Sequence, residues 1–372
     1  MNKKKVFIIA NCGWAIQNFR TLLIKELIRK GYVVHVICPR DEYIEELVSI
    51  GIVYYDWKLL RSGINPFSEF FSLIKLFLIC LKNRPDILMG FTIKPNIYGA
   101  IVAKLLKIPF MATITGLGTV FIEKSFFTVL VKSLYRHSLR GIYKVFFENK
   151  HDQKFFIEEK IVTKQNSITV GGAGVDTQKY APMLDQKEKD IFVFLLVARM
   201  LKDKGVIEFV EAARILHNKY SDMSFELLGP CDDINKTAIS SKEIKEWEKE
   251  GFIKYTGLVY ETKPYYAKAD CVVLPSYREG LSGVLLEASS MAIPTITTDV
   301  PGCQDVVRHG VNGFLCKARD VGSLVSAMEK IYKTPQDQRN VMGENGRRIA
   351  QQEFDVQKVT AEFCNVVDLA FK

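Results

Sequence analysis

The chain of 372 residues lacks the signatures of several common classes of protein. Its eight cysteines form no CxxC pair, since even the two nearest, Cys303 and Cys316, are thirteen positions apart. The sequence has no HExxH motif, and its five histidines are scattered. These absences argue against a zinc site and favour reduced, buried thiols in the cytoplasm.

Two motifs of nucleotide chemistry are also missing. The sequence has no GxxxxGK(S/T) phosphate loop, which argues against the P-loop nucleotidases. It has no Asp-x-Asp pair either, so there is no evident pair of carboxylates to hold a divalent cation against a diphosphate. We therefore expect neither a metal ion nor a tightly bound cofactor.

Long hydrophobic runs are absent as well. No stretch reaches the roughly 18 uncharged residues needed to span a membrane, and the most apolar one, 64–81, is interrupted by Glu69 and Lys75. The apolar run 6–10 is too short for the core of a secretory signal and instead predicts a first β-strand. We expect a protein that works in the cytoplasm without crossing a membrane.

The composition is typical of a globular protein, with a basic front half. Hydrophobic residues make up 48% and charged residues 25%, and a chain of this length commonly folds as two domains. The net charge is +9; the first 180 residues carry the excess of Lys and Arg, and the remainder is slightly acidic. A basic first domain predicts an anionic partner such as a membrane surface, a phosphorylated lipid or a nucleic acid.

Strand and helix patterns alternate along the chain. Short runs rich in Val, Ile and Phe occur at 5–10, 33–37, 53–55, 87–90, 110–113 and 144–147, and again at 192–198, 224–228, 253–256, 271–274, 295–298 and 313–315. Helical periodicity separates these runs, a pattern typical of parallel sheets covered on both faces. We predict two doubly wound, Rossmann-like α/β domains, 1–176 and 189–353, with the final helical segment 354–372 crossing back over the first domain.

Glycine and cations follow predicted strands, at the edge where open parallel sheets bind ligands. Gly13, after the first strand, lets the backbone approach a ligand closely. In the second half, Arg199 ends a strand and Lys204 opens a helix. Two cations at a helix N-terminus can bind a diphosphate, although solvated cations of a surface loop would have the same spacing.

The most specific pattern is a pair of glutamates after the buried strand 271–274. Glu279 falls in the predicted loop, and Glu287 falls two turns into the following helix. The segment 280–283 places unpaired N–H groups at the helix start, which suits a phosphate. Each carboxylate can accept two hydrogen bonds from a hydroxyl-rich ligand. The alternative is a capping glutamate and a surface glutamate.

In this order along the chain, these motifs resemble those of retaining glycosyltransferases of family 4, which have the GT-B fold. The resemblance rests on Gly13, the turn 172–176 (GAGVD), the Arg199/Lys204 pair and Glu279-x7-Glu287, and it covers nearly the whole chain. The GT-B fold implies two Rossmann-like domains that face each other across a cleft.

The front half resembles one subgroup, the bacterial undecaprenyl-diphosphate-sugar α-1,3-N-acetylgalactosaminyltransferases. The segments that carry this resemblance are Asn18-Phe19-Arg20, Arg61-Ser62, Asn65-Pro66-Phe67, Lys94-Pro95-Asn96 and Gly116-Leu117-Gly118. Many relatives have a histidine near the reacting sugar in the loop after the fifth strand, but this loop reads TITG at 113–116. No side chain there is an evident partner for the anomeric carbon.

The resemblance implies a role for each motif in transferring a sugar from a UDP-sugar, with UDP-sugar as a co-substrate. The catalytic group is Glu279, Arg199 and Lys204: the cations neutralise the diphosphate, and Glu279 holds the hydroxyls of the donor sugar. Glu287 binds the ribose. The remaining donor-binding residues are Gly13, Leu258 near the base, Gly280, Leu281, Ser282 and Gly283.

The resemblance further implies that the first domain holds a lipid-diphosphate-linked acceptor, bound by Arg20, Arg61 and Lys94. One predicted helix there has cations on one side and apolar residues on the other. The cations are Lys124, Lys132, Arg136 and Arg140, and the apolar residues are Phe127, Leu130, Val131 and Leu134. Such a helix can lie on an anionic membrane, which predicts a peripheral protein on the cytoplasmic face of the inner membrane. The alternative is a core helix with a solvated cationic face.

Two other functions have to be weighed. A UDP-sugar 2-epimerase has the same two-domain architecture, but it uses acids and a histidine in the cleft that cannot be placed in this sequence. A basic nucleic-acid-binding or scaffold protein would explain the charge. However, the cations are not interleaved with aromatic residues in an RNP-like motif, and no helix-turn-helix spacing is present, so we expect no nucleic acid partner.

Overall fold

The computed structural model describes residues 3–59, 65–117, 126–183, 191–231, 235 and 237–372. The chain forms two compact units. Unit 1 comprises Met1–Ala173 and Val356–Lys372, and unit 2 comprises Gly174–Asp355. Each has the parallel α/β architecture that the alternation of strands and helices predicts.

Unit 1 is built around a seven-stranded sheet in its described part, with the strand order β3-β2-β1-β4-β5-β6-β7 and every pair parallel. The strands are β1 (Lys5–Ile9), β2 (Val33–Cys38), β3 (Val53–Asp56), β4 (Ile87–Phe91), β5 (Phe110–Ile114), β6 (Lys144–Phe147) and β7 (Ser167–Thr169). The helices are α1 (Gly13–Arg29), α2 (Ile44–Ser49), α3 (Pro66–Asn83), α4 (Ile93–Leu106), α5 (Phe126–Leu139), α6 (Lys150–Glu158) and the C-terminal α13 (Val356–Leu369).

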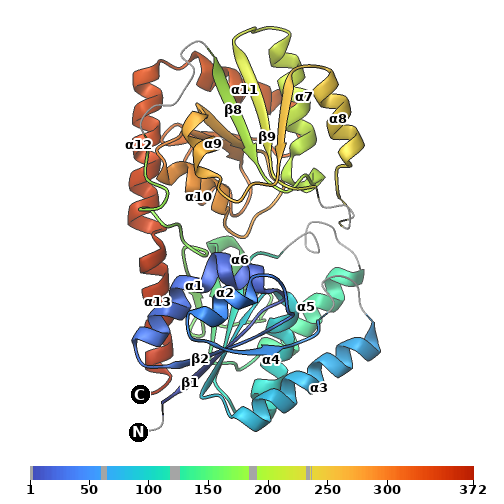
Figure 1. Ribbon diagram of the computed structural model, residues 1–372, viewed down its shortest axis with the longest axis vertical. Helices are drawn as coiled ribbons and strands as arrows, with labels where there is room; N and C mark the ends of the chain where they lie inside the picture. Colours follow the sequence, from blue (N-terminus) through green and yellow to red (C-terminus); the bar gives the residue numbers. More distant parts are fainter. Residues whose placement is uncertain (1–2, 60–64, 118–125, 184–190, 232–234, 236) are drawn as a thin grey trace. The chain divides into compact units, whose positions relative to one another are not determined.

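The two faces of this sheet form separate hydrophobic layers. Along β1, Val6 and Ile8 point to the layer that contains α1, α2 and α13, while Phe7 and Ile9 point to the layer under α3, α4, α5 and α6. This alternation follows from the two-residue repeat of a strand. It explains why the central strands, such as β1 and β4, are nearly continuous apolar runs, because both faces of the sheet are covered (Figure 1).

Unit 2 has a six-stranded parallel sheet in its described part, in the order β10-β9-β8-β11-β12-β13. The strands are β8 (Phe192–Val197), β9 (Met223–Leu228), β10 (Ile253–Gly257), β11 (Cys271–Leu274), β12 (Thr295–Thr298) and β13 (Gly313–Cys316). The helices are α7 (Val206–His217), α8 (Ser241–Lys249), α9 (Lys263–Lys268), α10 (Gly283–Ser290), α11 (Val321–Lys333) and α12 (Gln336–Glu353), and a short 3₁₀ turn spans Lys202–Lys204.

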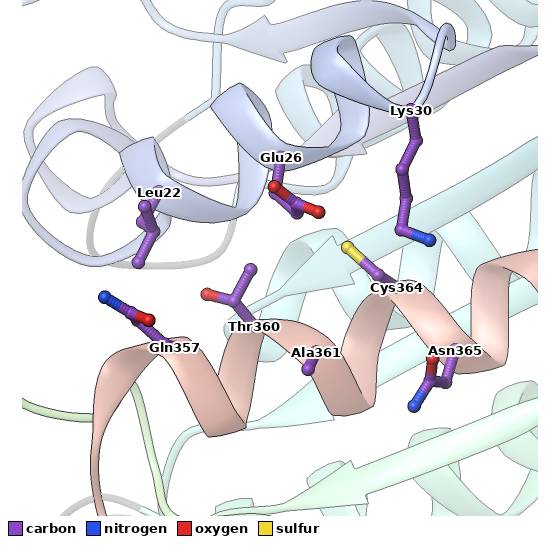
Figure 2. A pocket seen from close by; sticks show the side chains of 8 residues that line it. All are labelled: Leu22, Glu26, Lys30, Gln357, Thr360, Ala361, Cys364 and Asn365. Carbon is purple, nitrogen blue, oxygen red and sulfur yellow. The ribbon is translucent and has the colours of Figure 1, made fainter.

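The chain returns from unit 2 to unit 1 after Asp355, and α13 packs against α1 (Figure 1). Phe363 of α13 is buried, and its ring stacks on that of Phe146 with a centroid distance of 4.4 Å. Asp368 accepts hydrogen bonds from Lys30 and Tyr32. A groove of about 330 Å³ remains between the two helices (Figure 2); it is lined by Leu22, Glu26, Lys30, Gln357, Thr360, Ala361, Cys364 and Asn365.

One helix start differs from the sequence pattern in a way that matters for the site. The periodicity predicts that the helix after β4 begins near Tyr98, but α4 begins at Ile93 and includes Pro95 in its first turn. Proline is tolerated there because the first N–H groups of a helix have no partner within the helix. As a result, Lys94 lies at the start of α4, beside the carboxyl end of β4.

Candidate functional site

The candidate site in unit 2 is built where three neighbouring strands end. In the sheet, β8 lies beside β11, and β11 lies beside β12. Arg199 and Lys204 follow β8, while Glu279 follows β11. Because the strands are parallel, their carboxyl ends meet at one edge, and this brings together segments about 80 residues apart in the sequence.

Lys204 and Glu279 form an ion pair at this edge. The Lys204 Nζ lies 2.6 Å from the Glu279 Oε1, and the two side chains are only 23% and 12% exposed. An ammonium group has three N–H donors, so Lys204 can hold Glu279 and still donate to a phosphate. The resemblance assigns Lys204 to the diphosphate and Glu279 to the sugar of one ligand. In the structure these two side chains are in contact.

The segments that carry this pair are fixed to each other through the backbone. The Asp203 carbonyl oxygen accepts hydrogen bonds from the backbone N–H of Tyr277, at 2.9 Å, and from the hydroxyl of Ser276, at 3.2 Å. The Tyr277 hydroxyl donates to the Glu208 carboxylate of α7 at 2.5 Å. These bonds hold the turn before α7 against the loop after β11, so the positions of Lys204 and Glu279 are coupled.

Gly205, which follows Lys204, allows this close approach. Its φ of +74° lies in the left-handed region, and a Cβ added to it would lie 2.1 Å from the carbonyl oxygen of Pro275. No residue with a side chain can therefore occupy this position unless β11 and the turn separate.

The loop after β12 supports the glutamate loop from the other side. The N–H of Glu279 donates to the Pro301 carbonyl at 3.2 Å, and the N–H of Ser282 donates to the Gly302 carbonyl at 3.3 Å. A Cβ on Gly302 would come within 2.5 Å of the Glu279 carbonyl oxygen. Asp305 accepts a hydrogen bond from the Gly302 N–H and so fixes this loop.

The start of α10 is capped on its inner side and open on its outer side. Ser282 is buried, and its hydroxyl accepts a hydrogen bond from the N–H of Leu285. Gly283 is exposed, and a Cβ placed there would meet no atom within 4 Å. There is therefore room for an anion at the positive end of the α10 dipole.

Glu287 lies one to two turns further along α10. Its carboxylate accepts a hydrogen bond from the Tyr266 hydroxyl of α9 at 2.9 Å. Burial raises the pKa of Glu287 above its usual value, while the Tyr266 and Tyr180 hydroxyls and the nearby Lys179 act in the opposite direction. The structure thus presents a partly exposed carboxylate that can accept hydrogen bonds from two hydroxyl groups of a ligand.

The other predicted residues of unit 2 lie at the same edge of the sheet. Arg199 is exposed just after β8, and Leu258 is 70% exposed just after β10. Since β9 separates β8 from β10, Leu258 lies two strands from the Lys204 side of the site.

In unit 1, Gly13 begins α1 and has a structural role of its own. The N–H of Trp14 donates to the Asp41 carboxylate at 3.0 Å. A Cβ on Gly13 would lie 2.3 Å from Asp41 Oδ1 and 2.7 Å from the Ile44 side chain. The absence of a side chain at this position is therefore explained within unit 1, by the approach of the loop before α2.

The three cations predicted to bind an acceptor are placed differently. Arg20 is 5% exposed, lies 3.4 Å from Glu148, and packs over the Phe91 ring. Burial lowers the pKa of its guanidinium, and Glu148 opposes that shift. Lys94 is 23% exposed and contacts Glu69 of α3. Arg61 lies outside the described residues.

The helix predicted to dock on a membrane, α5, has less free charge than its sequence indicates. Lys132 and Arg136 both pair with Glu159, at 2.5 Å and 3.3 Å. Leu130 and Leu134, which the pattern places opposite the cations, are 39% and 41% exposed. Lys124 lies outside the described residues, and the side chain of Phe127 is not described.

The described residues hold neither a cluster of metal-ligating side chains nor a membrane-spanning helix. Within the described ranges, no group of three or more His, Cys, Asp or Glu side chains is arranged to hold a metal ion. In that same part of the chain, no helix combines the length and apolar character needed to cross a bilayer.

Sequence comparison decides the family. The profile described as "Glycosyl transferases group 1" matches residues 182–349, and "Glycosyl transferase 4-like" matches residues 5–149. The chain is 28% identical to the N,N'-diacetylbacillosaminyl-diphospho-undecaprenol α-1,3-N-acetylgalactosaminyltransferase of Campylobacter jejuni, over 99% of both chains. Together the two profiles cover most of the chain, which belongs to the glycosyltransferases that they describe.

Other relatives agree with this assignment. The glycosyltransferase is 26% identical to the UDP-Gal:α-D-GlcNAc-diphosphoundecaprenol α-1,3-galactosyltransferase of Escherichia coli, over 87% of this chain and 86% of the relative. Among solved structures, a glycosyltransferase from Rickettsia africae matches with a TM-score of 0.81 and 16% identity over 100% of both chains. Anabaena HepE in complex with UDP and glucose matches with a TM-score of 0.77 and 16% identity, over 98% of this chain and 99% of that one. The fold is therefore GT-B.

Sequence reasoning about this glycosyltransferase missed the residues that hold the glutamate loop, namely Gly205, Tyr277, Gly302 and Asp305. The sequence contained a weak signal for a close approach of two segments, because a glycine directly follows both Lys204 and Glu279. Their role depends on which strands are neighbours, which local sequence does not reveal.

The raised pKa of Glu287 gives this glycosyltransferase a testable pH dependence. We expect UDP affinity to fall as the pH is lowered through that pKa, above the ordinary value of 4.5, because protonation removes the charged acceptor. Glu287→Gln should weaken binding about 10- to 100-fold at neutral pH and remove the part of the pH dependence that exceeds the titration of the UDP phosphate itself. Calorimetric titration with UDP between pH 4.5 and 8, on the wild type and the variant, measures the UDP affinity and its dependence on pH.

The raised pKa of Glu287 also determines whether ionisation of this carboxyl stabilises or destabilises the folded protein. A raised folded-state pKa means that ionisation of Glu287 costs folding free energy once the pH exceeds that pKa, so Glu287→Gln should not lower the melting temperature at pH 8. Glu261→Gln, at an exposed carboxylate in the same unit, is the matched control. If both variants bind UDP like the wild type, Glu287 does not contact the nucleotide.

Proposed function

We propose that this glycosyltransferase moves a hexose or an N-acetylhexosamine from a UDP-sugar to a saccharide linked to a lipid diphosphate, with retention and without a metal ion. N-acetylgalactosamine is the first sugar to test, because the C. jejuni relative is named for its transfer. The names of both curated relatives include a diphosphoundecaprenol acceptor, and HepE was solved with UDP. The reaction belongs to the assembly of a surface glycan.

The observation that carries the proposal is the Lys204–Glu279 pair at 2.6 Å. A nucleotide-sugar presents a diphosphate next to a ring of hydroxyl groups, and this pair offers an ammonium donor next to a carboxylate acceptor. In the proposed complex, Lys204 and Arg199 bind the diphosphate, the start of α10 faces a phosphate oxygen, and Glu287 accepts from the ribose hydroxyls. Leu258 lies near the base.

In the proposed mechanism, the bond between the anomeric carbon and the diphosphate oxygen breaks as negative charge moves onto UDP. Fixed cations aimed at that charge stabilise it without reorganising, and one such donor typically contributes about 3 kcal/mol at the transition state. The acceptor hydroxyl bonds to the anomeric carbon on the face that UDP leaves, and its proton passes to the departing phosphate oxygen. The product is therefore an α-glycoside.

We assign the acceptor's diphosphate to Lys94 and Arg61. Lys94 is at the start of α4 and is about a quarter exposed, whereas Arg20 is almost fully buried against Glu148. With such an acceptor, the protein works on the cytoplasmic face of the inner membrane as a peripheral protein.

A transfer assay tests the proposal. Purified protein is incubated with labelled UDP-GalNAc, UDP-GlcNAc, UDP-Gal or UDP-Glc and a panel of diphospholipid-linked saccharides, with and without EDTA. We expect one donor to give label in the lipid phase, an α-linkage by NMR, and the same rate with EDTA. Release of free sugar or of an epimer would refute transfer, and loss of turnover in EDTA would refute metal independence.

A further inference from the structure

The outer side of α3 is apolar along its whole length. All residues of this 18-residue helix are described, and six large apolar side chains are exposed. Their exposed fractions are 79% for Phe67, 60% for Phe70, 66% for Phe71, 37% for Ile74, 55% for Leu78 and 48% for Leu81. At 3.6 residues per turn these side chains fall within an arc of about 100°. We call this arc the α3 stripe.

The α3 stripe is centred on the side of the helix that faces away from the core. The opposite side is buried through Ser72, Leu76 and Cys80, which cover the sheet layer under α3. A surface helix normally turns polar residues outward, and an exposed apolar surface of this size indicates an interaction site. Figure 1 shows α3 on the outside of unit 1, beside α4.

The charges around the α3 stripe are complementary to an anionic surface. Lys75 and Lys82 are exposed and lie about 70–90° from its centre on the helical wheel, on one flank of the stripe. Lys75 also lies 3.7 Å from the carboxylate of Asp56, and both of these side chains remain more than 40% exposed. The one acidic residue of the α3 sequence, Glu69, is turned toward α4, where it accepts hydrogen bonds from Lys94 and Tyr98. No carboxylate of α3 therefore interrupts the apolar arc, and the nearest charges on the helix are cations.

The most exposed part of the stripe lies at the ligand-binding edge of the sheet. Phe67, Phe70 and Phe71 occupy the first turns of α3, close to Glu69 and therefore to Lys94 at the start of α4. A lipid diphosphate held by Lys94 would have its hydrocarbon chain next to these rings. The stripe is also a single convex helix face, about 27 Å long, with the shape of a helix that lies flat in a bilayer surface.

We infer that α3 docks this protein on an anionic phospholipid bilayer, with the α3 stripe among the acyl chains and Lys75 and Lys82 at the headgroups. The inference rests on the proposed function in that a lipid-linked acceptor requires access to a membrane. It makes α3, with its arc of six exposed apolar side chains, the main contact surface in place of α5.

Vesicle flotation tests the inference. Wild-type protein is mixed with phosphatidylcholine vesicles containing one quarter phosphatidylglycerol, and the bound fraction is measured against lipid concentration. Phe67→Ser/Phe70→Ser/Phe71→Ser should weaken partitioning about 100-fold, because three largely exposed rings no longer insert. Lys75→Ala/Lys82→Ala should weaken it by about fivefold per charge on these vesicles, and hardly at all on pure phosphatidylcholine.

Two controls separate α3 from the rest of the surface. Val48→Ser changes a 43% exposed residue of α2, on the other face of the same sheet, and should leave binding unchanged. Lys132→Ala/Arg136→Ala should also change it little. If the α5 variant loses binding while the triple phenylalanine variant keeps it, the inference is wrong and α5 is the docking helix.

The remaining outcomes distinguish this inference from the proposed function. The triple variant should transfer sugar to a short-chain, water-soluble acceptor at the wild-type rate, but more slowly to a long-chain acceptor in vesicles. Wild-type vesicle binding without any transfer would refute the function and leave the docking surface standing. A wild-type dimer by light scattering that the triple variant dissociates, with no vesicle binding, would show that the α3 stripe binds a second copy and overturn the inference.

Discussion

Replacing Lys204 by methionine is expected to lower kcat/KM for sugar transfer by about 100- to 1,000-fold while leaving the protein folded. Methionine keeps most of the side-chain volume but removes the charge that faces the diphosphate of the donor. Because Lys204 and Glu279 are 2.6 Å apart, Glu279→Gln should have a loss of similar size. The double variant should lose little more than either single variant, since residues in contact are not additive.

Steady-state kinetics over a range of donor concentrations measures this effect, with the melting temperature as a check on folding. Lys202→Met is the matched control, because Lys202 lies in the same 3₁₀ turn but is exposed. We expect it to retain activity within about twofold. Near-normal turnover of the Lys204→Met enzyme, or an equal loss in the control, would remove Lys204 from the site.

Gly205→Ala is expected to destabilise unit 2 by about 2–4 kcal/mol and to reduce activity as well. Alanine must adopt a φ near +74°, and its Cβ would overlap the Pro275 carbonyl at 2.1 Å. Relief of this overlap moves the turn that carries Lys204 away from the loop that carries Glu279. Denaturation in urea gives the loss of stability, and the transfer assay gives the loss of function.

The matched control is Gly251→Ala. Gly251 also has a positive φ, +86°, but a Cβ there would meet no atom within 4 Å. The Gly251→Ala substitution should lower the free energy of unfolding only by the conformational strain, about 1 kcal/mol, and should leave turnover unchanged. If the two alanine variants are equally stable, the contact between Gly205 and Pro275 does not position the site.

The alternation of strands and helices was predictable because buried parallel strands leave a strong pattern of short apolar runs. The start of α4 was not, since the periodicity indicated a start near Tyr98, whereas the helix begins at Ile93 and includes Pro95 in its first turn. The outward orientation of the α3 stripe also could not be predicted from the sequence. Large apolar residues occur both on the outer side of α3 and on its buried side, so the sequence does not indicate which side is covered.

The candidate site was predictable only in its residue types. The motif spacing indicated Lys204 and Glu279, but their contact depends on β8 lying beside β11, which follows from the crossover order of the sheet. The same limit applies to Arg20, whose exposure could not be anticipated because its partner Glu148 is 128 residues away. The roles of these residues in binding and catalysis remain predictions.

A crystal structure of the full chain with UDP, grown with magnesium in the solution, tests the central claim most directly. The account predicts that the diphosphate contacts Lys204 and Arg199, that the ribose hydroxyls donate to Glu287, and that no cation bridges the phosphates to a carboxylate. A nucleotide bound away from these three residues, or a magnesium ion coordinated by the diphosphate and an acidic side chain, would contradict it.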